Sequence, residues 1–179
     1  MRGRLWTVVL GLLVLGLLTV NLQSASAHRW WKWHWNKSTV RYWNFATRKT
    51  QAQAAINDWD ACSGFKLSKR TSHTDISVYD GNFGDTGWGG LASIKSRKWD
   101  WWCPFLFCGV THGHARFNSF YGGSNNWVKG VFCQEVGHLF GLGHSPHGCM
   151  GLSYFTSISG NQYAVNRSHS CPDVRAYTH

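Results

Sequence analysis

The alternation of apolar and polar residues predicts a chain that mixes strands with two helices. Alternating, β-branched and aromatic residues predict strands over 38–45, 74–80, 91–94 and 114–121. Apolar residues at helical spacing predict one helix over 50–62 and a second from Trp127 to Phe140. Gly141 then stands where a left-handed residue would end the second helix.

Residues 1–27 have the pattern of a secretory signal peptide. Arg2 and Arg4 precede an apolar run over 5–20, and Ala-Ser-Ala at 25–27 provides a small-x-small cleavage site. An uncleaved membrane anchor is the alternative, but the run is slightly short for a spanning helix, which needs ~20 apolar residues. We therefore expect a protein that is secreted to an extracellular compartment after cleavage at this site.

The segment 28–37, HRWWKWHWNK, alternates four tryptophans with basic residues. The pattern fits an arm that stacks on glycans or a membrane interface, and it fits equally a segment laid over the core. We therefore treat 28–37 as a Trp-rich basic N-terminal arm, followed by one domain over 38–179.

The charge balance is basic, with 18 Lys and Arg residues against 8 Asp and Glu residues. These basic residues are scattered and form no stripe, and secretion separates the protein from nucleic acid, so no nucleic-acid partner is expected. The charge predicts attraction to an anionic cell-envelope surface, and we expect a monomer.

Residues 133–144, CQEVGHLFGLGH, contain the candidate chemistry. Gln134 and His138 are four residues apart on the predicted helix, so both side chains leave the same face. Glu135, the only glutamate in the chain, is rotated by about 100° and would lie beside a metal bound there. After Gly141 the chain turns back, and His144 can supply a third ligand. Three protein ligands and one open position are typical of a catalytic zinc site.

This segment resembles the HExxHxxGxxH helix of the metzincin zinc endopeptidases, with Gln134 in place of the first histidine. Met150 is similar to the methionine of their Met-turn, and the order of elements over 38–151 resembles the matrixin-like catalytic domain. A secreted bacterial group of matrixin-like proteins also has glutamine at this position. The resemblance implies an α+β domain with a mixed twisted sheet, an active-site helix and a Met-turn.

The same resemblance implies a secreted zinc-dependent metalloendopeptidase that cleaves a protein or peptide substrate. It implies that Zn²⁺ is held by Gln134, His138 and His144, and that Glu135 is the general base for a metal-activated water. The substrate is expected to lie along an edge strand, for which 114–121 is the leading candidate.

The amide of Gln134 is a weaker zinc donor than imidazole, so another histidine could compensate for it. His147, His112 and His114 are the candidates, although a surface histidine without a ligand role is the simpler interpretation of each. The insert at 95–109 is interpreted as a packed loop in preference to a substrate-gripping flap.

Six cysteines follow the expected cleavage site, and an even number predicts disulfides in an oxidising compartment. A bond between Cys133 and Cys149 would tie the active-site helix to the Met-turn. If Cys103 and Cys108 close a local loop, Cys62 and Cys171 are left to pair. Sequence alone allows 15 pairings of six cysteines, so this connectivity is a hypothesis.

Two other functions compete with proteolysis. The first is a catalytically inactive metzincin-fold protein that binds cell-envelope glycans or another protein through its tryptophans. The second is a basic, Trp-rich, disulfide-stapled protein that acts on membranes through residues 28–37.

Overall fold

The computed structural model describes residues 33–62, 64, 66–99, 108–145, 147–151, 163–167, 170–171 and 174. The expected signal peptide at 1–27, residues 28–32 of the arm and residues 100–107 of the insert lie outside these ranges. No helix in the described part of the chain is long and apolar enough to span a bilayer.

Five strands form one mixed, mostly parallel sheet. They are β1 (Thr39–Asn44), β2 (Lys66–Lys69), β3 (Ile76–Gly81), β4 (Gly90–Lys98) and β5 (Gly109–Asn118). Their order across the sheet is β2-β1-β3-β5-β4, and only β4 runs antiparallel to its neighbour. The sheet is compatible with the α+β class expected from the sequence.

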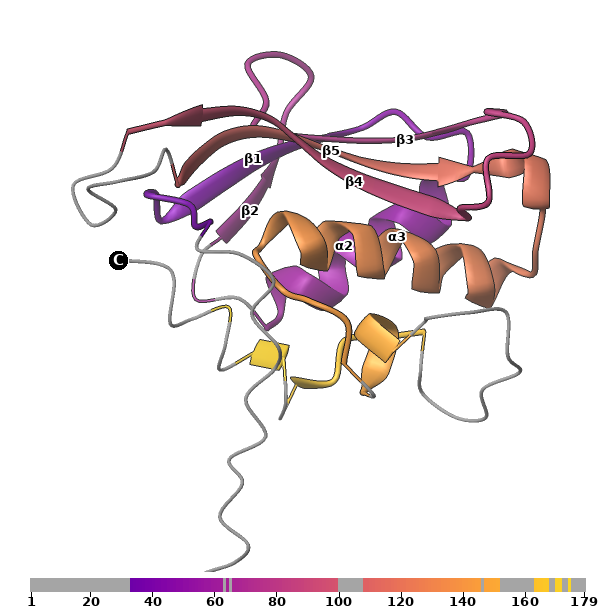
Figure 1. The fold of residues 1–179 in the computed structure, drawn as a ribbon. Coiled ribbons are helices and arrows are strands. Elements are labelled where there is room, and N and C mark those ends of the chain that lie inside the picture. The colour runs from indigo at the N-terminus through magenta and orange to yellow at the C-terminus, as the bar shows by residue number, and fades with distance from the viewer. Residues whose placement is uncertain are drawn as a thin grey trace, which may run out of the picture.

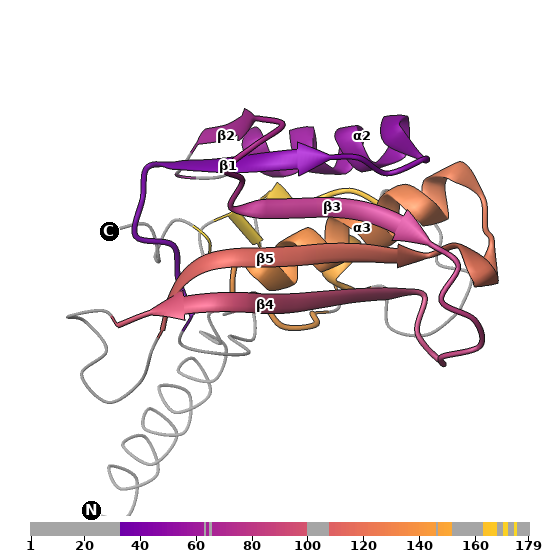
Figure 2. The same cartoon turned by 90° about the horizontal axis from the view of Figure 1, so that it is seen from above.

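Both long helices pack on the same face of this sheet (Figure 1). They are α2 (Lys49–Asp60) and α3 (Asn125–Leu139), and the short 3-10 turns η1 (Ser119–Tyr121) and η2 (Gly148–Gly151) flank α3 in the sequence. Trp59 of α2 is fully buried and its indole N–H donates to the carbonyl of Cys133 on α3 (2.8 Å). The opposite face of the sheet, seen in Figure 2, is covered by no helix of the described chain.

The strand expected at 114–121 is not the edge of the sheet. β5 begins earlier, at Gly109, and lies between β3 and β4, while 119–121 form a 3-10 turn. The edge strands of the described sheet are β2 and β4, so the prediction that a substrate would add to 114–121 is wrong. The backbone N–H and C=O groups of an internal strand are already hydrogen-bonded to the strands on both sides, so none is left for a substrate.

The described part of the Trp-rich arm packs on the core. Trp35 is 2% exposed, and its indole N–H donates to the carbonyl of Leu139 at the end of α3 (2.9 Å). His34 forms a parallel bridge with Gly109 at the start of β5. For residues 33–37, therefore, the core-packed interpretation of the arm is the one the contacts support.

Two disulfides join distant parts of the chain, Cys62–Cys171 and Cys133–Cys149, and both agree with the expected pairing. Cys108 is also disulfide-bonded, while its expected partner Cys103 lies outside the described residues. Disulfides of this kind are typical of extracellular proteins.

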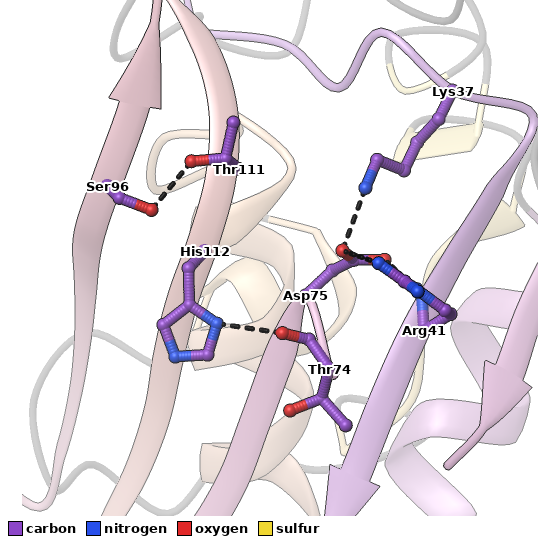
Figure 3. A network of polar contacts seen from close by, with 7 residues as sticks. All are labelled: Lys37, Arg41, Thr74, Asp75, Ser96, Thr111 and His112. Atoms are coloured by element: carbon purple, nitrogen blue, oxygen red, sulfur yellow. Dashed lines mark hydrogen bonds and ion pairs between the residues drawn. The ribbon is translucent and has the colours of Figure 1, made fainter. Parts of the chain in front are cut away.

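Asp75, just before β3, anchors the start of that strand to β1 (Figure 3). Its carboxylate accepts hydrogen bonds from the backbone N–H of Arg41 (2.7 Å), from the Arg41 guanidinium (3.1 and 3.2 Å) and from Lys37 Nζ (2.7 Å). Burial acts to raise the pKa of Asp75, but the hydrogen bonds from Arg41 and Lys37 outweigh it and hold the pKa below its usual value. The charged carboxylate of Asp75 therefore links the start of β3 to β1.

Candidate metal centre

Helix α3 places the candidate ligands and is defined at both ends by its sequence. Ser124 caps the start, where its hydroxyl accepts from the backbone N–H of Trp127 (3.2 Å). At the other end Gly141 has φ 83°, and the N–H of Leu142 reaches the carbonyl of Gly137 (3.2 Å). This is a Schellman ending, which a residue with a Cβ would adopt at a cost. It turns the chain back so that the residues after Gly141 return towards the helix.

The return brings Gln134, His138 and His144 together. The Gln134 amide nitrogen donates to His144 Nδ1 at 3.2 Å, and the rings of His138 and His144 have centroids 4.8 Å apart. Gln134 is buried, His138 is half-buried and His144 is exposed. The cluster therefore lies beside the buried C-terminal part of α3, and its exposed member, His144, is the side from which a small molecule or ion can reach it.

The ring of His138 is oriented by the backbone of the same turn. Its Nδ1 donates to the carbonyl oxygen of Leu142 at 2.7 Å, which assigns the proton of the neutral ring to Nδ1 and the lone pair to Nε2. Desolvation lowers the pKa of His138 to about 4, against the raising effect of the bond to Leu142. At neutral pH the ring is therefore an uncharged nitrogen donor, held as metal-ligating histidines commonly are.

Glu135 is buried against the edge strand β4. It is 5% exposed, and a Cβ added to Gly90 would lie 2.6 Å from its Oε1 atom. Burial raises the pKa of Glu135 to about 8, although the backbone N–H of Ala92 and the charge of Arg116 act to lower it. A carboxyl group with its pKa near neutrality is able both to accept and to return a proton.

Met150 lies under the helix, on the side of Gly137. A Cβ on Gly137 would clash with the Met150 sulfur and would lie 2.7 Å from the ring of Trp59. The turn that carries Met150 is closed by a hydrogen bond from the Ser145 N–H to its carbonyl (3.0 Å) and is joined to α3 by the neighbouring Cys133–Cys149 disulfide. The methionine thus forms a fixed floor beneath the helix.

The histidines considered as replacement ligands do not all lie near this cluster. Gly113 packs against Leu139 of α3, so His112 and His114, its neighbours in β5, stand on the opposite face of the sheet. The suggestion that His112 or His114 is a replacement ligand in this site is therefore wrong. His147 is exposed, and its backbone N–H donates to the Ser145 hydroxyl (3.4 Å).

Across the described residues, no group of three or more His, Cys, Asp or Glu side chains could hold a metal ion. Within the described residues, the polar group that joins the two histidines is the Gln134 amide, whose nitrogen lies 3.2 Å from His144 Nδ1. A set of two imidazoles and one amide oxygen fits zinc more weakly than three imidazoles do.

Sequence reasoning did not identify three contributors to the site, namely Gly90, Ala92 and Leu142. The Gly89-Gly90 pair is a signal that a close backbone approach could occur there. Leu142 contributes its backbone carbonyl and Ala92 its backbone N–H. Every residue type has these groups except that proline lacks the N–H, so the sequence gives no signal for such roles.

No protein-family model and no curated protein matches this chain. Among the solved structures that are similar to this chain is one titled "Structure of myroilysin", with a TM-score of 0.40 and 14% sequence identity. The likeness covers 61% of this chain and 50% of that chain, so this chain aligns with half of its length. A likeness this distant assigns neither family nor activity.

Proposed function

We propose that this protein is a secreted zinc-dependent metalloendopeptidase of metzincin type. One observation carries the proposal: Gln134 and His138 of α3 meet the exposed His144, next along the helix to the buried carboxyl group of Glu135. A nitrogen-rich cluster next to a proton-transfer group is the combination that hydrolytic metal sites require.

The residues that would hold zinc are His138 and His144 through imidazole nitrogens and Gln134 through its amide oxygen. A half-turn of the Gln134 amide exchanges its nitrogen for its oxygen on the side of His144, at no cost in packing volume. When bound, zinc would supply Lewis acidity, which polarises a carbonyl group and makes water more acidic. Because an amide is a weaker donor than imidazole, it would lower the affinity and leave the ion more electrophilic.

Glu135 would be the proton carrier of the reaction. With a cation held by His138 and His144, the pKa of Glu135 would fall from about 8, and its carboxylate form would be available to accept a proton from water. Burial then favours the protonated form, which can pass the proton to the leaving amine. The N–H of Ala92 holds the carboxyl group against β4 throughout.

The substrate would bind along β4, which forms the edge of the described sheet next to Glu135. An extended peptide can add to such an edge through backbone hydrogen bonds, independent of most side chains. Half-buried residues of β4 such as Leu91 would then contact the substrate close to the cluster.

The test is cleavage of casein by purified protein loaded with zinc, compared with Glu135→Gln and Glu135→Ala. Removal of the proton carrier should lower the rate by about 10²–10⁴-fold while the zinc content stays that of the wild type. Asp85→Asn, at an exposed site in the loop before β4, is the control and should keep full activity. Equal activity of the wild type and the Glu135 variants would refute the mechanism.

A non-catalytic role in glycan binding is the second candidate, favoured by aromatic rings on the open face of the sheet. Trp43 and Phe45 are 38% and 42% exposed, and Phe45 stacks on Tyr79 with centroids 4.9 Å apart. Such rings can pack on sugar faces. Loss of cell-wall glycan binding in Trp43→Ala, with unchanged casein cleavage, would support this role beside the first.

A further inference from the structure

The open face of the sheet carries a second pair of histidines that the proposed peptidase does not use. His112 and His114 are two residues apart on β5, and both side chains leave the strand on the face away from α3. Their separation from the Gln134 cluster by the sheet itself makes them an independent feature.

The two rings face each other through the same kind of atom. Nε2 of His112 lies 3.1 Å from Nε2 of His114. His112 Nδ1 is 3.0 Å from the carbonyl oxygen of Thr74 (Figure 3), and His114 Nδ1 is 3.2 Å from the hydroxyl of Tyr79. Both Nδ1 atoms are therefore held by groups on the neighbouring strand or the loop before it, and the two Nε2 atoms lie next to each other.

The protonation of the pair follows from these partners. A carbonyl oxygen only accepts, so the Thr74 contact puts a proton on His112 Nδ1 and a lone pair on its Nε2. Two arrangements then satisfy His114. Either its Nε2–H donates to His112 while Tyr79 donates to Nδ1, or its Nδ1–H donates to Tyr79 and both Nε2 lone pairs point at a shared cation.

We propose that His112 and His114 form a binding site for a divalent transition-metal ion, coordinated by both Nε2 atoms. Metal–nitrogen bonds of about 2.0–2.1 Å at angles between square and tetrahedral place two nitrogens about 2.9–3.4 Å apart. The observed separation of 3.1 Å between the two Nε2 atoms lies in this range. Binding needs no net release of a proton, because His114 exchanges one tautomer for the other and the Tyr79 hydroxyl turns from donor to acceptor.

The supporting contacts match those of established metal sites. A ligating histidine usually donates its other ring N–H to a carbonyl or hydroxyl group, which fixes the ring and increases its basicity. Thr74 and Tyr79 play these two parts here. Neutral imidazole suits Cu²⁺, Ni²⁺ and Zn²⁺, and among these the stability order favours Cu²⁺.

Two positive groups near the pair limit its affinity. Lys95 and Arg116 both exert a positive potential on His114, although the Arg116 guanidinium donates to the Ser93 hydroxyl (2.6 Å) and lies over the ring of Trp88. They disfavour a bare cation and favour an anion as a further ligand. The remaining coordination positions of the ion would then be taken by water or by an anion such as a carboxylate.

The test is Cu²⁺ binding by the full chain in a His144→Ala background, which weakens the Gln134 cluster on the other face. Electron paramagnetic resonance with one equivalent of Cu²⁺ should show coupling to two imidazole nitrogens. His112→Asn and His114→Asn should each lower the apparent affinity by at least tenfold, and Tyr79→Phe by a smaller factor. His73→Asn, which changes an exposed histidine in the loop before β3, is the matched control and should bind as the background does.

A second measurement leaves the pair intact. Substoichiometric Cu²⁺ should broaden the imidazole NMR signals of His112 and His114 before those of any other histidine. Unchanged affinity in both Asn variants, or first broadening at other histidines, would overturn the proposal. Because these readouts do not involve peptide cleavage, an inactive protein that binds Cu²⁺ at the pair would refute the peptidase proposal and leave this one standing.

Discussion

Gln134 decides how tightly the proposed peptidase site would hold zinc. If its amide oxygen is a ligand, Gln134→Ala removes one of three protein donors and should lower zinc affinity by at least tenfold. Gln134→His replaces the oxygen with a preferred nitrogen donor and should raise affinity above that of the wild type. Competition with a coloured chelator measures both.

Gln51→Ala, on α2, is the matched control because it removes the same side chain from the other helix. If Gln134→Ala keeps the wild-type zinc affinity, the amide is not a ligand, and only the two histidines would remain as protein donors.

Gly137 shows how a single missing Cβ lets the floor of the site approach the helix. Alanine usually stabilises a helix by about 1 kcal/mol relative to glycine. At this position the added methyl group would clash with Met150 and Trp59. Overpacking of this kind costs about 1–3 kcal/mol, so Gly137→Ala should lower the free energy of unfolding in urea. A gain in stability would mean that Met150 does not pack against α3 as described.

At the scale of whole elements, Asp75 joins β3 to β1 through charged hydrogen bonds. Asp75→Asn should lower the free energy of unfolding at pH 7 by roughly 2–3 kcal/mol, because the buried carboxylate accepts several charge-assisted bonds. The folded-state pKa of Asp75 is below the unfolded value of about 3.9, so this stability is present above pH 3.9 and is lost as the pH falls through the folded pKa.

Urea unfolding of wild type and Asp75→Asn from pH 7 down to the acid range measures this dependence, and the two curves should converge at low pH. Asp85→Asn is the control, since Asp85 is exposed and accepts from the Tyr121 hydroxyl, and it should shift stability by less than about 0.5 kcal/mol. A constant gap between wild type and Asp75→Asn at every pH would contradict the charged role.

The elements with strong periodicity are the ones that the sequence predicts well. The predicted strand at 38–45 and helix at 50–62 correspond to β1 and α2 within one or two residues, since apolar spacing reports directly on a buried face. β2 has no such signal, because only Leu67 of its four residues is buried. Strand order is equally hidden, since an alternating pattern shows which face is buried and says nothing about which neighbours pair.

The site divides in the same way. Helical spacing brings Gln134 and His138 to one face, and the left-handed Gly141 turns His144 back to them, as local rules anticipate. The placement of His112 and His114 needs knowledge of which face of β5 meets α3. The packing of the whole core determines which face of β5 meets α3. The close approach of Gly113 to Leu139 shows the result.

At the scale of the whole molecule, the two described disulfides have different expected effects, one on overall stability and the other on the candidate site. Cys62–Cys171 spans 109 residues and ties the end of α2 to the C-terminal part of the chain, whereas Cys133–Cys149 spans 16 residues beside the candidate site. Loop-closure entropy assigns about 4.7 kcal/mol to a bond across about 100 residues and about 3 kcal/mol to one across about 15. Stability should therefore depend more on the distant bond.

The site should depend more on the short bond. Replacing Cys133 and Cys149 together with alanine frees the turn that carries Met150 from α3, so zinc affinity should fall along with the free energy of unfolding. Replacing Cys62 and Cys171 should cost more stability and leave zinc affinity within about twofold in the fraction that remains folded. Urea unfolding and chelator competition on both double variants separate the two effects. An equal loss of zinc affinity in both would mean that the candidate site depends on global stability alone and that the Cys133–Cys149 bond has no local role in fixing its floor.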